Sequence, residues 1–250
     1  MKRIKLTVAY DGTVYCGWQI QPQVPTIESV LNDTLSRILR EDIQVIGASR
    51  TDAGVHALGN VAVFDTETPI PPDRISYAVN PHLPDDIRII SSCQAADDFH
   101  PRFCDSRKTY EYRIQTGPSL LPTSRRYSHW LPGRPDIAAM QEAGAYIVGT
   151  HDFKSFCAAG AQVKTTVRTV LSVDVEEGEL LPGFHEILIR VSGEGFLYNM
   201  VRIIVGTMLK AGFGVWPPEH VKTIIEGRDR TLAGETVPAR GLCLKGIEYL

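Results

Sequence analysis

The chain has 250 residues, of which 43 % are hydrophobic and 22 % charged, so it can bury a substantial core and intrinsic disorder is not expected. The formal net charge of −3, taken alone, argues mildly against a nucleic-acid partner. No apolar stretch is long enough for a membrane span or has the form of a signal peptide, and the five scattered cysteines include no CxxC pair. We therefore expect a soluble, cytoplasmic protein without a membrane partner, disulfide framework or structural zinc site.

The first 105 residues predict alternating strands and helices. Apolar and polar residues alternate from Arg3 to Tyr10, which is typical of a half-buried strand. Thr26 is a good N-cap residue, and apolar residues follow it at helical spacing from Ile27 to Ile38. The other elements expected in this half are strands at 43–46, 61–64 and 87–90 and a weaker helix at 73–79.

The rest of the chain repeats this order of elements. Strands are expected at 110–114, 166–175, 186–191 and 242–249, helices at 137–147 and 200–209, and a short helix beginning at Pro217-Pro218. Both halves therefore follow the order β-α-β-β-α-β. We predict an α+β protein of two ferredoxin-like halves, 1–105 and 106–250, whose mainly antiparallel sheets join into one extended sheet with helices on one face.

Positive charge is concentrated near the middle of the chain. Seven lysines and arginines lie between residues 99 and 134, against only Asp105 and Glu111, whereas the stretch 65–98 is acidic. Such segregation suggests a positive face on an acidic body, and the distribution of charge says more about partners than its sum does.

The most informative segment is the polar loop from Gly47 to Ala57, which contains two glycines and lies between two apolar strands. Loops held by a rigid sheet often carry reactive groups. Asp52, between Thr51 and Gly54, suits a turn that exposes a carboxylate, although local chemistry alone favours an Asx-turn without a chemical role.

Metal and cofactor sites have little support in the sequence. His56 follows Asp52 by four residues, but one His–Asp pair supplies too few ligands and the other histidines are dispersed. There is no Gly-x-Ser-x-Gly elbow, no Walker A sequence and no GxGxxG after a strand. We expect a protein without metal and without a small-molecule cofactor.

The loop sequence GASRTDAGVHA closely resembles the catalytic motif of the TruA family of tRNA pseudouridine synthases. Six further motifs resemble that family's motifs in the same order: YDG with YCGWQ at 10–12 and 15–19, DFHPRF at 98–103, KTYEY at 108–112, GTHDF at 149–153, GFLYNMVR at 195–202 and GLCL at 241–244. One departure is Glu28, where the family has glutamine in its first helix. Several motifs in family order are far more specific than any one of them.

This resemblance implies an isomerase that converts uridine to pseudouridine at positions 38, 39 and 40 in the anticodon stem-loop of tRNA. Asp52 would be the essential carboxylate, tRNA the partner, and the active species a homodimer. The reaction breaks the N1–C1′ bond, turns the uracil and forms a C5–C1′ bond. Whether Asp52 attacks C1′ or C6, or abstracts a ribose proton, stays open.

The resemblance also suggests roles for three other side chains, and the position of Arg50 two residues before Asp52 suggests one for a fourth. Tyr110 would lie against the uracil, Arg202 would pair with Asp52, and Leu244 would keep water away; each also has an ordinary structural reading in a core or on an apolar surface. Arg50 would pair with Asp52 or fill the stack left by the flipped base, or simply contact a phosphate. The charge distribution adds candidate phosphate contacts at Arg102, Arg107, Lys108, Arg125 and Arg126.

The sequence alone leaves two alternative functions open. The first is a non-catalytic RNA-binding module or tRNA chaperone, which would not need a carboxylate in a loop. The second is a nucleoside hydrolase based on a carboxylate, which would release free uracil and leave an abasic product.

Overall fold

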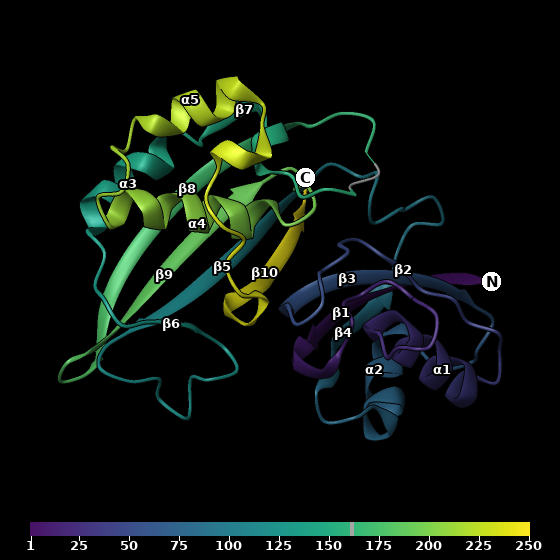
Figure 1. Ribbon diagram of the computed structural model, residues 1–250. Helices are drawn as coiled ribbons and strands as arrows, with labels where there is room; N and C mark the ends of the chain where they lie inside the picture. The colour runs from purple at the N-terminus through teal and green to yellow at the C-terminus, as the bar shows by residue number, and fades with distance from the viewer. Residues whose placement is uncertain (161–162) are drawn as a thin grey trace. The chain divides into compact units, whose positions relative to one another are not determined.

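The computed structural model describes residues 1–160 and 163–250, which form two compact units (Figure 1). Unit 1 consists of residues 1–106 and 243–250, and unit 2 of residues 107–242. The expected second half, 106–250, differs from unit 2 at its end, because the last strand groups with unit 1. Within the described ranges, no helix has both the length and the apolar character that a membrane span requires.

Unit 1 is a mixed α+β unit in which the predicted order β-α-β-β-α-β is confirmed. Its elements are β1 (Lys2–Tyr10), α1 (Ile27–Leu39), β2 (Ile46–Gly47), β3 (His56–Thr66), α2 (Ile75–Val79), β4 (Ile87–Gln94) and, from the end of the chain, β10 (Leu242–Tyr249). The neighbours β4, β1 and β3 are antiparallel, and β2 pairs antiparallel with β3. Figure 1 shows α1 and α2 side by side on one face of this sheet.

The strand expected at 43–46 is much shorter than predicted. Ile43 N–H donates to the Ser36 hydroxyl at 2.9 Å, and Val45 N–H donates to Asn32 Oδ1 at 2.8 Å. These two amides are used by side chains of α1, so they do not enter a strand ladder. Only Ile46 and Gly47 pair with β3.

Helix α1 begins at the predicted place for the predicted reason. The Thr26 hydroxyl accepts from Ser29 N–H at 3.3 Å, and the Ser29 hydroxyl accepts from Thr26 N–H at 3.2 Å. This reciprocal capping box satisfies two amides that have no partner in the helix itself. The apolar stripe that includes Leu31 and Leu35 is buried, which confirms the helical period read from the sequence.

Unit 2 is also mixed α+β, and its elements are β5 (Ser106–Thr116), β6 (His129–Leu131), α3 (Ile137–Ala145), β7 (Gly149–Asp152), β8 (Val167–Leu181), β9 (Phe184–Gly193), α4 (Met200–Gly212) and α5 (His220–Gly227). Its sheet runs β5–β9–β8–β7 with antiparallel neighbours, and β6 pairs parallel with β5. Strands β6 and β7 were not predicted, because three or four residues with little apolar alternation carry no strand signal.

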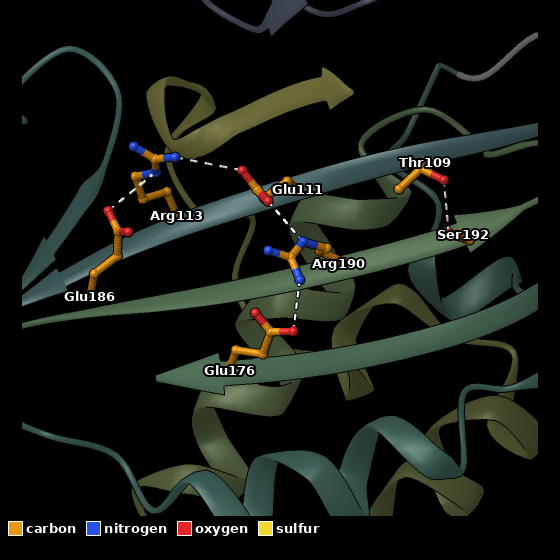
Figure 2. Close-up of polar contacts among 7 residues, drawn as sticks. All are labelled: Thr109, Glu111, Arg113, Glu176, Glu186, Arg190 and Ser192. Atoms are coloured by element: carbon orange, nitrogen blue, oxygen red, sulfur yellow. Dashed lines mark hydrogen bonds and ion pairs between the residues drawn. The ribbon is translucent and has the colours of Figure 1, made fainter. Parts of the chain in front are cut away.

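The strands of unit 2 carry ion pairs on the side chains that alternate with the core-facing ones (Figure 2). On β5, Glu111 is only 5 % exposed, and its carboxylate accepts from Arg190 Nε of β9 at 2.9 Å. Arg190 also binds Glu176 of β8 at 2.8 Å, while Arg113 binds Glu186 at 3.3 Å. These cross-strand pairs fix the register of β5, β9 and β8.

Candidate active site

Asp52 lies in the loop between β2 and β3, and its side chain is half-buried. Its backbone carbonyl accepts from Val55 N–H at 3.1 Å, and Gly54 has φ of +77°, so a tight turn follows the carboxylate. Asp52 therefore lies four residues before the start of β3, a mostly buried strand. The loop is therefore displayed by a rigid support, as the sequence predicted.

The segment after β1 holds this loop from one side. Trp18 N–H donates to Thr51 O at 3.0 Å, and Gly54 N–H donates to Tyr15 O at 3.2 Å. Gly17 has φ of +87°, and a Cβ added there would lie 2.5 Å from Thr51 O. Only glycine fits such a conformation and such a close approach of two backbones. The YCGWQ motif is thus a support for the loop.

Two aromatic residues of that motif anchor the support. The indole of Trp18 is buried against Gly47, where an added Cβ would lie 2.3 Å from Nε1. The Tyr15 hydroxyl donates to Asp86 Oδ1 at 2.6 Å. Burial and this hydrogen bond raise the pKa of Tyr15, so the phenol stays protonated and remains a donor. Both contacts hold the loop without using any group of Asp52.

Buried side chains of strands β1 and β3 also form hydrogen bonds to the Asp52 loop. The Tyr10 hydroxyl lies 2.8 Å from Thr51 Oγ1, and Asn60 Nδ2 donates to the Tyr10 hydroxyl at 3.2 Å. Asn60 Nδ2 also donates to Ser49 O at 3.0 Å. Sequence reasoning gave Asn60 no role, because it lies just before the predicted strand 61–64, whereas the observed strand already begins at His56.

His56 is buried at the start of β3. Its Nδ1 lies 3.1 Å from Gly12 N and 3.2 Å from Asp11 Oδ1. Across the described residues, no group of three or more His, Cys, Asp or Glu side chains is placed to hold a metal ion.

Leu244 and Arg50 are two further candidate residues of unit 1. Leu244 is fully buried on β10, which runs parallel to the start of β3 and places Leu244 opposite Ala57. The strand from the end of the chain therefore lies beside the exit of the Asp52 loop. Arg50 is exposed two residues before Asp52, on the loop itself.

Tyr110 of β5 is 8 % exposed, and its ring meets Phe196 edge to face at 5.3 Å between centroids. It shares strand parity with Tyr112, which is fully buried and donates its hydroxyl to Pro238 O at 2.8 Å. Burial raises the pKa of Tyr112, which is consistent with a packing role for its ring. Phe196 was not singled out from the sequence, where it is one residue of a longer motif.

Arg202 of α4 has two identified partners in unit 2. Its Nε donates to Val237 O at 2.7 Å, and its Nη1 donates to Asn199 Oδ1 at 2.6 Å. A backbone carbonyl and a side-chain amide oxygen thus orient the guanidinium. Asp52 belongs to unit 1, whereas Tyr110 and Arg202 belong to unit 2, so their meeting stays a prediction.

The candidate phosphate contacts differ in exposure. Four are exposed, namely Arg102, Arg107, Arg125 and Arg126, and Lys108 is half-buried. Two arginines of the same basic stretch have carboxylate partners within the sheet of unit 2, namely Arg113 and Arg134. Arg134 forms a two-pronged pair with Glu177, at 2.7 and 2.8 Å.

Glu28, the one departure noted in the sequence, lies in the first turn of α1. Its Oε2 accepts from Ile20 N–H at 2.9 Å, and its own N–H donates to Trp18 O at 3.0 Å. The carboxylate thus closes the loop that leads into α1. It makes this contact through an oxygen, which a glutamine side chain would also provide.

The family model and the similar proteins described next all point to the same protein family. A family model described as tRNA pseudouridine synthase matches residues 6–104 and 143–250. The chain is 45 % identical to tRNA pseudouridine synthase A of Clostridium acetobutylicum over 249 residues, which cover all of both chains. It is 46 % identical over 249 residues to tRNA pseudouridine synthase A of Ruminiclostridium cellulolyticum, again covering both chains in full.

Other matches vary in coverage. The chain is 43 % identical to tRNA pseudouridine synthase A of Shouchella clausii, of which it covers 94 %. Among solved structures, a chain from the crystal structure of a Cbf5-Nop10-Gar1 complex is 17 % identical, with a TM-score of 0.36, covering 82 % of this chain and 45 % of that one. No conclusion about the fold follows from a structural likeness of that size.

Proposed function

From the premise that this chain belongs to the tRNA pseudouridine synthase family and is an isomerase acting on tRNA, we propose that it converts uridines 38, 39 and 40 of the anticodon stem-loop to pseudouridine, with Asp52 as the catalytic carboxylate. One observation carries the assignment of Asp52. Its loop, which resembles the family's catalytic motif, is anchored by the YCGWQ segment and by a buried polar network. Such rigid display is what a catalytic group requires.

A carboxylate suits this reaction. The side chain of a free aspartic acid has a pKa of about 3.9 and is ionised at neutral pH, so a carboxylate in general needs no neighbouring base to become reactive. The N1–C1′ bond breaks, the uracil turns, and C5 bonds to C1′; the proton that leaves C5 is balanced by the proton that N1 gains. Attack at C1′, attack at C6 and abstraction of a ribose proton are three routes that use Asp52 differently.

We assign the other candidate residues to binding of the target nucleotide. Stacking of a base on an aromatic ring contributes about 1–3 kcal/mol, which is the role given to Tyr110. Removing a base from a helix costs a few kcal/mol, and the planar guanidinium of Arg50 is suited to replacing the lost stacking. Arg202 supplies positive charge and Leu244 an apolar surface that excludes water.

The reaction class is tested with tRNA carrying tritium at C5 of its uridines. The proposal predicts release of label into water, intact RNA, and pseudouridine at 38–40 on nucleoside analysis. A matched tRNA with cytidine at these three positions should release none. Label retained despite tight binding would indicate a non-catalytic RNA-binding module, and free uracil with an abasic product would indicate a hydrolase.

The five candidate phosphate contacts predict a strong dependence of tRNA affinity on salt. If all five bind phosphates, log Kobs should fall with log salt with a slope of about −4, and each alanine substitution should reduce the slope by about 1. Arg134→Ala is the matched control, because that guanidinium is occupied by Glu177 and should leave the slope unchanged. A flat salt response of the unmodified protein would contradict these contacts.

By the same family resemblance we propose a homodimer that acts in the cytoplasm, and two ferredoxin-like halves for the fold. In a dimer, one subunit can hold the body of the tRNA while the other presents Asp52. Light scattering of the protein without tRNA should give a mass of about twice 27.7 kDa. A single-subunit mass under conditions of full activity would rule out this arrangement.

A further inference from the structure

Four polar groups from three separate segments meet inside unit 1. Tyr10 ends β1, Asn60 lies within β3, and Ser49 and Thr51 belong to the loop that carries Asp52. All four are buried, and Asn60 is 0 % exposed. Water cannot satisfy such groups, so they depend on one another for hydrogen bonds.

Asn60 is the centre of this cluster. Its Nδ2 donates to Ser49 O at 3.0 Å and to the Tyr10 hydroxyl at 3.2 Å. Its Oδ1 accepts from Ser49 N–H at 3.3 Å and from Val61 N–H at 2.9 Å. Both donors and the acceptor of one side chain are therefore used, and both backbone groups of Ser49 are held by it.

The cluster reaches Asp52 through Thr51. The Thr51 hydroxyl lies 2.8 Å from the Tyr10 hydroxyl, and the Thr51 carbonyl accepts from Trp18 N–H at 3.0 Å. Thr51 is thus held by its side chain and by its carbonyl at the same time. The carbonyl belongs to the peptide that joins Thr51 to Asp52, so its orientation fixes where N and Cα of Asp52 lie, and these positions together with φ determine the direction of the side chain.

The stability of the folded state does not by itself explain why these polar residues are buried here. A fully satisfied polar network contributes little more than apolar side chains of similar size, whereas one left partly satisfied is costly. What the network adds is a single arrangement, because each hydrogen bond specifies a distance and a direction. The neighbouring strand positions Val8 and Ala62 are apolar and fully buried, so polar side chains occur here where the loop must be held.

We propose that Tyr10, Thr51 and Asn60 are positioning residues of this enzyme, which fix the direction of the Asp52 carboxylate without touching the substrate. The inference rests on the proposed function, in which Asp52 is catalytic. A displacement of about 1 Å in a reacting group can reduce the rate about 100-fold. Loosening the cluster therefore lowers the rate of the chemical step and leaves tRNA binding largely unchanged.

The test uses Thr51→Val, which keeps the shape and removes the hydroxyl, and Tyr10→Phe, which removes only the phenol oxygen. Single-turnover rates are measured with enzyme in excess over tRNA, together with the Kd for tRNA and the Tm. Each variant should lose about 10-fold to 100-fold in rate, with its Kd within about threefold of the unmodified value. Thr51→Ser restores the hydroxyl and should recover most of the rate.

Thr66→Val is the matched control. Thr66 is a buried threonine near the other end of β3, 1 % exposed, and its hydroxyl lies 2.9 Å from the Glu41 carboxylate. Its loss should lower the Tm without changing the single-turnover rate. Equal behaviour of Thr51→Val and Thr66→Val, with lower Tm and normal rates, would overturn the inference.

Two further arms remove ambiguity. If Thr51→Val does not fold, the single-turnover rates of Tyr10→Phe and Thr51→Ser test the inference instead. A normal rate in Tyr10→Phe also overturns it. Asp52→Asn separates this inference from the proposed function. If that variant is inactive while Tyr10→Phe and Thr51→Val have normal rates, only the positioning role fails; if it remains active, the catalytic assignment fails.

Discussion

Asp52→Asn is expected to abolish pseudouridine formation, with a loss of at least about 10³-fold in single-turnover rate, the order of effect found when an essential catalytic group is removed. The substitution preserves size and removes the charge, so it leaves no group able to attack carbon or accept a proton effectively. Affinity for tRNA should stay within about threefold, because binding depends mainly on phosphate contacts elsewhere. Tritium release and a filter-binding Kd measure the two effects.

Asp65→Asn is the control for that substitution. Asp65 is also an aspartate of unit 1, on β3, and its carboxylate binds the Arg3 guanidinium at 2.7 and 2.8 Å. This change removes an equal charge and a two-pronged ion pair but should leave the rate within about twofold, since partly exposed pairs contribute at most about 1 kcal/mol. Normal turnover by Asp52→Asn would show that another residue performs the chemistry.

Gly17→Ala is expected to have the second largest effect, on stability and activity together. A Cβ at this position would lie 2.5 Å from Thr51 O and 3.1 Å from the Asp52 carbonyl carbon, and the residue has φ of +87°. The obstructing atoms are backbone, so the loop itself must move. We expect a loss of about 2–4 kcal/mol in the free energy of unfolding and about 100-fold or more in rate.

Gly183→Ala separates the two causes of that loss. Gly183 has φ of +81°, close to that of Gly17, but an added Cβ would meet nothing within 4 Å. It should cost only the strain of a left-handed alanine, about 1 kcal/mol, with no change in rate. Chemical denaturation and single-turnover assays of both variants decide the point. Similar stability losses would mean that the close approach to the Asp52 loop is unimportant.

The sequence by itself determined the elements whose signals are local. Alternation from Arg3 to Tyr10 predicted β1, and Thr26 with the stripe through Leu35 predicted α1, because strand and helix periods and caps depend only on near neighbours. It also located the Asp52 loop, since a polar segment with two glycines between apolar strands, matching a specific motif, needs no knowledge of distant contacts.

The tertiary structure decided the features that depend on partners far along the chain. It shortened the strand before the loop, because Asn32 and Ser36 take the amides of Val45 and Ile43. It moved the last strand into unit 1 by pairing Leu244 with Ala57.

The support of the candidate site was likewise hidden from the sequence. The role of Asn60 is visible only in the folded chain, where its amide donates to Tyr10 and Ser49, which are 50 and 11 residues away in the sequence. A hydrogen bond depends on distance and direction in space, whereas the pattern of residues along a chain records only which groups are available to form one.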